Sequence, residues 1–209
     1  MSFSTPLEEP DAATDPFELF APWMDEARQL SRFAGAAALA TATADGVPSL
    51  RMVLVVIWGA SGFVFHSDHR SRKALELVAN PNAALLFDWD ELGRQVRVEG
   101  TVTQISPKES DAYAATRPRD ALIVEHASEQ SAPIDSRAEL LSRLRAAEAS
   151  FDAGVVPRPT TWGGYRLRPL RVEFWQHRED RLHDRLLYEA APLIDADAPA
   201  SWRRTRLQP

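Results

Sequence analysis

The chain has 209 residues, of which 44% are hydrophobic and 26% charged, which is enough material for one large domain with a core. Its formal net charge of -6 argues against a nucleic-acid partner, and the absence of cysteine excludes disulfides, thiolate metal sites and cysteine nucleophiles. There is no run of 18 apolar residues and no signal-peptide pattern, so we expect no membrane partner and a cytoplasmic location.

The N-terminal part is predicted to be a flexible tail followed by a helix. Residues 1–14 are acidic and contain proline, whereas residues 15–209 are expected to form a single domain. Asp15 is the predicted N-cap of the helix, with Pro16 at the first helical position and Glu18 completing a capping box. Apolar side chains then recur at helical spacing and predict the face that packs on the domain: Phe17, Phe20, Met24, Ala27 and Leu30.

The segment from Pro48 to Lys73 joins an apolar run to a basic turn. Residues 50–58 are apolar apart from Arg51, a pattern typical of a strand that is buried on both faces. A turn at residues 59–62 returns the chain into a second strand over residues 63–65. Together they predict a hairpin that leads directly into a polar segment.

A predicted anion site follows this hairpin. Ser71 is the expected N-cap of a helix over residues 72–80, so Arg72 and Lys73 fall in its first turn. The helix dipole disfavours cations there, whereas free backbone N–H groups at the same end favour a bound anion. The alternative is a solvated basic turn that is balanced by Asp68 and Glu76.

Most of the remaining chain is predicted to be β-strand. Residues 94–105 alternate, with Gln95 and Arg97 on one face and valines on the other, while Ser106 and Ser136 each begin a capping box and a helix. The pattern of residues 121–133 is weak and is interpreted as a short helix and a polar loop. The other predicted strands cover residues 37–43, 83–89, 162–168, 171–176, 181–189 and 202–207. Because strands outnumber helices and follow one another through short turns, we expect a mainly β, antiparallel barrel with flanking helices; an open antiparallel α+β sheet is the alternative.

A second charged cluster lies near the C-terminal end. In a strand, Arg181, His183 and Arg185 would share one face, with Leu182 on the other. Three potential cations in a row repel one another, so they indicate a bound anion or ion pairs with neighbouring carboxylates; a solvated sheet rim is the alternative. Trp175, six residues before Arg181, is interpreted as a core residue rather than a stacking platform.

The motifs do not support two other chemistries. His66 and His69 lie just before a helix, but no carboxylate completes a ligand set, so we expect no metal. Neither the G-x-S-x-G motif of a serine hydrolase nor a glycine-rich phosphate loop occurs. The residues by themselves therefore predict an anionic small-molecule site on a β-barrel, without defining a reaction.

Several motifs, in this order, resemble the pyridoxamine 5'-phosphate oxidase family. They are RMVLVV, FHSDHRSRK, RQVRVEG, SDAYAATRPRD, WGGYRLRPLRVEFWQHREDRLHDR and RLQP, and the resemblance spans about residues 37–209. It implies an FMN-binding split barrel. It also implies a homodimer with FMN in the two clefts at the subunit interface.

The resemblance further implies roles for individual residues. Arg72 and Lys73 would hold the FMN phosphate, and Arg181 and His183 would form the catalytic pair over the substrate. His66 and Ser67 stand where the family usually has Tyr-Thr, and both keep hydrogen-bonding groups. The remaining implied flavin contacts, some of which would reach across the dimer interface, are Arg51, Met52, Val53, Leu54, Gln95, Gln130, Ser131, Trp175 and Arg185.

The implied substrate site departs from the family pattern. The vitamin-forming oxidase of the family holds the substrate phosphate with a lysine, a tyrosine, an arginine and a serine. Tyr113 and Arg117 are retained here, but Val56 takes the lysine position and Ala121 the serine position. This loss should weaken the binding of a dianion by several kcal/mol, since each charge-assisted hydrogen bond contributes ~1.5–3 kcal/mol, unless Arg119 or another cation compensates.

A branch of the family in phenazine biosynthesis oxidises unphosphorylated tricyclic intermediates and also lacks that lysine. The ending RLQP is similar to this branch, whereas SDAYAATRPRD and RQVRVEG are more similar to the vitamin enzyme. We therefore expect an FMN-dependent oxidase that passes a hydride from a reduced nitrogen heterocycle to the flavin and on to O2, forming H2O2. The favoured substrate is an unphosphorylated dihydrophenazine-type compound. The alternatives are pyridoxine or pyridoxamine 5'-phosphate, and a flavin-binding protein without oxidase turnover.

Overall fold

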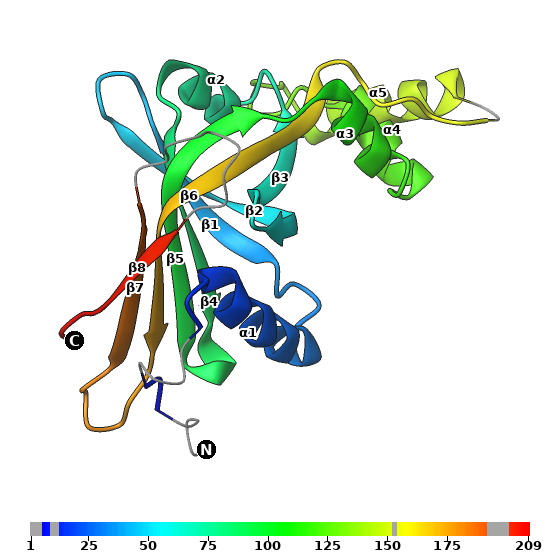
Figure 1. Ribbon diagram of the computed structural model, residues 1–209. Coiled ribbons are helices and arrows are strands. Elements are labelled where there is room, and N and C mark those ends of the chain that lie inside the picture. Colours follow the sequence, from blue (N-terminus) through cyan, green and yellow to red (C-terminus); the bar gives the residue numbers. More distant parts are fainter. Residues whose placement is uncertain (1–5, 9–12, 152–153, 192–200) are drawn as a thin grey trace.

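The computed structural model describes residues 6–8, 13–151, 154–191 and 201–209. Its strands form one antiparallel sheet in the order β3-β2-β1-β4-β5-β6-β7-β8, and an additional pairing of β3 with β6 closes the part from β3 to β6 into a barrel (Figure 1). The predicted antiparallel barrel with flanking helices is thereby confirmed. The strands are β1 (Ala36–Ala42), β2 (Pro48–Gly59), β3 (Gly62–Asp68), β4 (Asn82–Trp89), β5 (Arg94–Gln104), β6 (Trp162–Gln176), β7 (Asp184–Ala190) and β8 (Trp202–Arg206).

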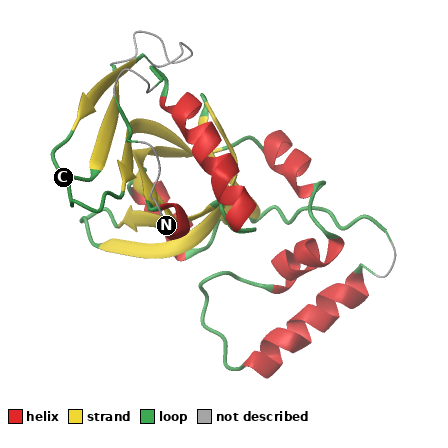
Figure 2. Cartoon of the chain, turned by 90° about the horizontal axis from the view of Figure 1, so that it is seen from below, coloured by secondary structure: helices red, strands yellow, loops and turns green. Residues whose placement is uncertain are grey.

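The helices lie outside the barrel, and three of them form an arm. Figure 2 shows α3, α4 and α5 extending away from the strands, beyond the β5 and β6 ends that connect to them. The capping box at the start of α3 is confirmed, because Ser106 Oγ accepts from Glu109 N and the Glu109 carboxylate accepts from Ser106 N. The helix bounds are α1 (Pro16–Leu30), α2 (Arg72–Ala79), α3 (Pro107–Ala114), α4 (Arg119–Ala127) and α5 (Arg137–Ser150), with a short 3-10 helix at Asp90–Leu92.

Helix α1 contributes directly to the barrel core. The Asp15 carboxylate accepts from Phe17 N at 2.8 Å and so caps the helix start. Phe20, which is fully buried, meets the rings of Phe63 and Phe87 edge-on at centroid distances of 5.2 and 5.1 Å. The predicted helix face is confirmed at Phe20, Met24 and Ala27, whereas Leu30 is exposed.

Strand β2 is buried on one face only, so the prediction of burial on both faces is wrong. Leu50, Met52 and Leu54 point outward with exposed fractions of 69%, 65% and 49%. Ala38 of β1 and Leu86 of β4 continue the same row in register with Met52. We call these five residues the apolar outer face. An apolar run on a half-exposed strand is typical of a surface that another protein chain covers.

Strand β6 is one long strand, whereas the sequence predicts two strands over residues 162–168 and 171–176. Pro169 lies opposite Gly100, where the β5–β6 register shifts between Glu99 and Gly100. A proline inside a sheet lacks one ladder hydrogen bond and is tolerated at such an irregularity. Gly100 is needed there, since a Cβ at this position would lie 2.0 Å from the Arg168 carbonyl oxygen.

The predicted strand over residues 181–189 begins late. Strand β7 starts at Asp184, and residues 177–183 form the loop that joins it to β6. Arg181 has a φ of +64°, in the left-handed region, and Leu182 N donates to the Asp180 carboxylate. Arg181 and His183 therefore lie in a turn, and the expected shared strand face with Arg185 does not form.

Most of the predicted N-terminal tail lies outside the described residues, but Leu7 and Ala13 contact the sheet. Leu7 N donates to the Asp184 carboxylate at 3.2 Å, and its carbonyl oxygen accepts from Arg206 at 2.5 Å. The Ala13 carbonyl oxygen accepts from Tyr188 Oη at 2.8 Å. These bonds hold two points of the segment against β7 and β8.

Candidate functional site

A basic cluster lies where β2, β3 and α2 meet. It consists of Arg51 from β2 and of Arg72 and Lys73 from the first turn of α2. Ser71 occupies the predicted N-cap position, but its side chain makes no capping hydrogen bond. The backbone N–H groups of this helix end are therefore not satisfied by a capping side chain, which is the arrangement that binds anions.

Lys73 is buried with neutral partners. Its Nζ donates to Gln130 Oε1 at 2.7 Å, to Ser67 Oγ at 2.9 Å and to Ser71 Oγ at 3.4 Å. No carboxylate lies within 4 Å of this ammonium among the described residues. Burial, with a further contribution from Arg51, lowers the pKa of Lys73 to about 8. A buried cation that lacks an ion-pair partner in the part of the chain that the structure describes favours an anionic ligand.

Glu76 connects the two arginines of the cluster. It accepts from Arg72 Nε at 2.8 Å and from Arg51 Nη2 at 3.2 Å, and also from the hydroxyls of Thr41 and Ser49. Burial alone would raise the pKa of Glu76, but these hydrogen bonds outweigh it and lower the pKa to about 2. The carboxylate is therefore ionised at neutral pH and holds the arginines in place.

A cavity of about 380 Å³ opens beside the basic cluster. Arg72 and Glu76 line it from α2, while Gln130 and Ser131 line it from the loop after α4. Of the sequence-predicted flavin contacts, the structure thus brings together Arg51, Ser67, Arg72, Lys73, Gln130 and Ser131. Three cations, hydroxyl groups and a helix start without a capping side chain fit a phosphate monoester.

A second region, next to the first, is aromatic. His66, on β3 beside Ser67, stacks on Tyr113 with a centroid distance of 4.0 Å and on Trp162 at 5.0 Å. Neither ring nitrogen of His66 has a hydrogen-bond partner within the described part of the chain. Burial, followed by the charges of Arg117 and Arg158, lowers the pKa of His66 to about 4, so the ring is neutral at neutral pH.

The predicted substrate residues surround this aromatic region. Arg117 lies over the Trp162 ring at 4.8 Å and pairs with Glu125 at 3.1 Å. Val56 stands at the irregularity of β2 between Val55 and Ile57, and bulges of this kind redirect side chains near functional sites. Ala121 is half-buried in the first turn of α4.

Arg119 lines a cavity together with Arg117 but contacts the end of helix α5. Its guanidinium donates to the carbonyl oxygen of Phe151, on the exposed side of the helical arm. The sequence left open whether this arginine replaces the lost cation. Its contact in the structure directs it to the α5 end.

A third group of predicted residues lies in one row across β5, β6 and β7. Gln95 pairs with Trp175, and Trp175 pairs with Arg185. Glu173 accepts from Arg185 at 2.8 Å and from Arg97 at 2.6 Å; burial would raise its pKa, but these arginines lower it. Trp175 is half-buried, so its interpretation as a core residue is wrong.

The loop next to this row carries the predicted catalytic pair. His183 lies 4.8 Å from the Trp175 ring, and its Nδ1 accepts from the backbone N–H of Arg178 at 3.0 Å. In the neutral imidazole the proton is then on Nε2, which is available to a substrate. Arg181 is exposed beside it. The pair is therefore presented by a turn, with the tautomer of His183 set by the main chain.

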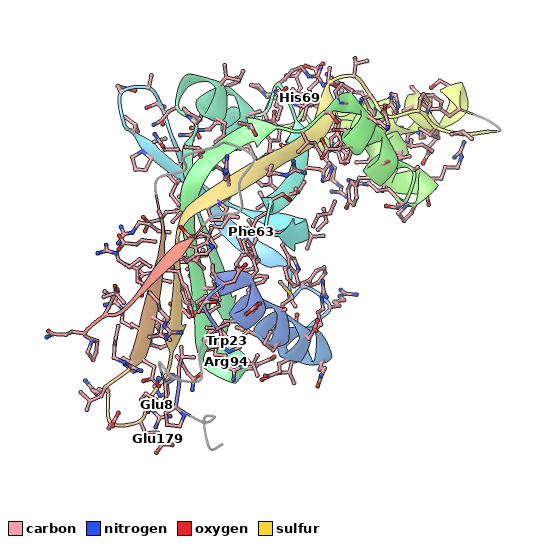
Figure 3. The ribbon with its side chains drawn as sticks, in the orientation of Figure 1. Glu8, Trp23, Phe63, His69, Arg94 and Glu179 are labelled. Atoms are coloured by element: carbon pink, nitrogen blue, oxygen red, sulfur yellow. The ribbon has the colours of Figure 1, made fainter. Side chains whose placement is uncertain are left out.

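Within one chain the basic cluster and the catalytic pair are far apart. Trp162, at the start of β6, pairs with Asp68 near the basic cluster, whereas Gln176, at its end, pairs with Asp184. Fifteen residues of strand extend over about 45 Å. Figure 3 shows the same separation, with His69 at one end of the molecule and Glu179 of the β6–β7 loop at the other. A single subunit does not bring these residues together.

Sequence reasoning missed two of the carboxylates that organise these regions, Glu125 and Glu173, and named Glu76 only as a charge that would balance a solvated basic turn. Glu76, Glu125 and Glu173 each bind an arginine of the candidate site. For Glu76 the signal was its position four residues after Arg72 on a helix, which places both on one side. Glu173 could have been found from its alternation with Trp175 on β6. Nothing in the local pattern indicated Glu125.

The comparisons with known proteins agree with this architecture. Residues 24–151 match the family described as pyridoxamine 5'-phosphate oxidase, and residues 162–209 match the pyridoxine 5'-phosphate oxidase C-terminal dimerisation region. The chain belongs to the pyridoxamine 5'-phosphate oxidase family. It is 52% identical over 204 residues to the pyridoxine/pyridoxamine 5'-phosphate oxidase of Rubrobacter xylanophilus, covering 97% of this chain and 91% of that protein. It is 50% identical to that of Rhodopseudomonas palustris, covering 95% and 92%.

Among solved structures, this family member is similar to PhzG from Burkholderia lata 383 in complex with tetrahydrophenazine-1-carboxylic acid. The TM-score is 0.87 at 32% identity, with 99% of this chain and 98% of that chain covered. An FMN-binding protein from Nostoc punctiforme shares the fold at a TM-score of 0.73 and 17% identity. In the described part of the chain, no helix is long and apolar enough to cross a membrane, and no group of three potential ligands could hold a metal ion.

Proposed function

We propose that this protein is a homodimeric, FMN-dependent oxidase of a reduced, unphosphorylated nitrogen heterocycle. The observation that carries the proposal is the contrast between its two candidate anion sites. The basic cluster at α2 presents a buried ammonium that has no ion-pair partner among the described residues, whereas the predicted substrate-phosphate site offers Arg117, which is already paired with Glu125. The first fits a cofactor phosphate, and the second does not fit a further dianion.

Dimerisation is supported by the separation of the site residues. The family's dimerisation region covers β6, β7 and β8, and the apolar outer face is exposed on one subunit. Pairing two copies would cover this face and place the β6–β7 loop of one subunit over the basic cluster of the other. Two equivalent sites would then form, as expected for a two-fold symmetric dimer.

In this arrangement FMN, when bound, supplies the acceptor for two electrons, which O2 then takes up to form H2O2. Arg72 and Lys73 bind the phosphate. His183 donates a hydrogen bond from Nε2 to the heterocycle, and Arg181 binds an anionic or polar substituent on it. The protein thus supplies binding, orientation and charge rather than a strong base.

The substrate assignment follows from what surrounds Arg117. Val56 supplies no cation and Ala121 no hydroxyl, and Glu125 occupies a hydrogen-bonding edge of Arg117. Burial raises the pKa of Glu125, although the nearby Arg117 opposes this shift. Adding a phosphate dianion next to this carboxylate would be repulsive. The rings of His66, Tyr113 and Trp162 stack on one another next to Arg117 and supply no cation in place of the lysine.

The second candidate is oxidation of pyridoxine or pyridoxamine 5'-phosphate. It is favoured by relatives of that name that are about half identical over nearly the whole chain. It requires that the phosphate be held without the lysine and the serine of the family pattern.

Oxygen uptake by the FMN-loaded protein distinguishes the two candidates. We expect turnover with a dihydrophenazine carboxylate, above the spontaneous oxidation measured with the Arg181→Ala variant, and little turnover with pyridoxamine 5'-phosphate.

The Val56→Lys/Ala121→Ser variant should gain affinity for that ester by at least about tenfold, because each restored charge-assisted bond contributes ~1.5–3 kcal/mol. Val56→Met/Ala121→Ser is the control for side-chain size without charge. Efficient oxidation of the ester by the unmodified protein would refute the substrate assignment. Bound FMN without oxygen uptake on any substrate would favour a flavin-binding protein without oxidase activity.

A further inference from the structure

Glu76 is the best connected carboxylate of the basic cluster, and the family resemblance gives it no role. Its Oε2 accepts from Thr41 Oγ1 at 2.5 Å, from Ser49 Oγ at 2.5 Å and from Arg51 Nη2 at 3.2 Å, while Oε1 accepts from Arg72 Nε at 2.8 Å. The donors come from β1, β2 and α2. One buried carboxylate thus connects three elements at the point where the anion site forms.

The bond to Arg72 fixes an otherwise exposed cation. The Arg72 side chain is 62% exposed, whereas that of Glu76 is 6% exposed. Because Nε is used by Glu76, the terminal nitrogens of Arg72, which have no partner among the described residues, are left to bind a ligand. A long side chain that is already anchored loses less rotamer freedom when it binds an anion.

Arg51 is held even more completely. Its Nη1 donates to the Leu39 carbonyl oxygen and to Thr41, and its Nη2 donates to Ser49 and Glu76. Glu76 also balances the charge of the cluster. Arg51, Arg72 and Lys73 together with Glu76 leave a formal charge of +2, equal and opposite to a phosphate monoester dianion.

We propose that Glu76 is a positioning residue for phosphate recognition, which sets the guanidinium groups of Arg51 and Arg72 in the geometry that selects FMN over riboflavin. The inference rests on the proposed FMN site and adds a determinant of its specificity. Glu76 lines the cavity beside the cluster, but its carboxylate would repel the phosphate rather than bind it. It acts through the two arginines.

The test compares two flavins that differ only in the phosphate. Titration of the apoprotein with FMN and with riboflavin, followed by flavin fluorescence, gives both dissociation constants. In Glu76→Gln we expect FMN binding to weaken by about tenfold or more, since an arginine loses its charge-assisted anchor, while riboflavin binding stays within about twofold. Thr41→Val removes one donor to Oε2 without changing any charge and should weaken FMN binding in the same direction by less. Glu148→Gln, on the exposed α5 helix, is the control for the change in net charge.

The outcomes separate this inference from the proposed function. Equal weakening of both flavins in Glu76→Gln would mean a general structural role and would overturn the inference. Unchanged or tighter FMN binding would overturn it as well, because the carboxylate would then only oppose the phosphate. If the unmodified protein itself does not prefer FMN to riboflavin, the proposed FMN site fails. Riboflavin binding by each variant shows that it is folded.

Discussion

Lys73, the proposed ligand of the cofactor phosphate, is a buried cation that lowers the stability of the fold in the absence of a ligand. A buried ammonium that is hydrogen-bonded only to neutral oxygens is less stable than one in water, which is why the pKa of Lys73 falls to about 8. Its folded-state pKa lies below the ordinary value of 10.5, so the folded apoprotein gains stability as the pH rises from about 8 to 10.5. A bound anion reverses this preference, because it stabilises the charged form.

The charge state of Lys73 leads to a prediction about pH. The FMN phosphate is a dianion above about pH 6, so binding requires a protonated Lys73 and should weaken as the pH rises through about 8. Flavin titrations between pH 7 and 10 measure this. In Lys73→Arg, whose guanidinium stays charged, FMN binding should not weaken over this range. Riboflavin binding should be independent of pH in both proteins, and an equal loss for the two flavins would contradict the assignment.

At the scale of elements, closure of the barrel depends on the residue at the start of β3, Gly62. Gly62 has a φ of +114°, and a Cβ there would lie 2.2 Å from the carbonyl oxygen of Leu167 on β6. The β2–β3 turn and the β3–β6 pairing therefore meet at a position that only glycine satisfies. The sequence predicts the turn at this place, but only the pairing of β3 with β6 reveals the second requirement.

Gly62→Ala should destabilise the protein strongly. The energetic costs of backbone strain and of a clash with a main-chain oxygen are additive here. We therefore expect a loss of more than about 3 kcal/mol in the free energy of unfolding, measured by urea denaturation. Gly46→Ala is the matched control: its φ is +88°, but nothing lies within 4 Å of the added Cβ. That substitution should cost only about 1–2 kcal/mol. Similar losses for the two variants would show that contact with β6 contributes nothing.

At the scale of the whole molecule, the candidate site is divided between the two ends of β6. Lys73 lies near its start, and the loop with Arg181 follows its end. Neither end contains both the proposed phosphate site and the predicted catalytic pair. The exposed apolar outer face offers the surface through which a second chain could join them.

Mixed dimers test this division directly. Lys73→Ala and Arg181→Ala should each lower activity severely. If each site takes Lys73 from one subunit and Arg181 from the other, unfolding and refolding the two variants together at equal amounts should restore about a quarter of the wild-type activity, because half of the dimers are mixed and each has one intact site. Sites built from a single chain would give no recovery. Refolding each variant alone is the control for recovery of the fold.

The sequence by itself determined the local features of this protein. Alternation in β5, the capped start of α1 and the capping box of α3 follow from neighbouring residues, and so does the cation pair at the start of α2. Motifs in a fixed order were sufficient to indicate the family. These features depend on contacts within a few positions, which a periodic pattern records.

Only the tertiary structure decided the rest, because it depends on residues distant in the chain. Whether β2 was buried on one face or two depended on what packs against it, and its apolar pattern could not distinguish a core face from an exposed apolar face. The turn at Arg181 overrode a strand-like pattern through local hydrogen bonds. The contacts of Glu76 could be recognised only in the folded protein, where hydroxyl groups of β1 and β2 lie beside α2 and donate to its carboxylate. The ionisation and the contacts of a buried carboxylate depend on its hydrogen-bond partners and not on its place in the sequence.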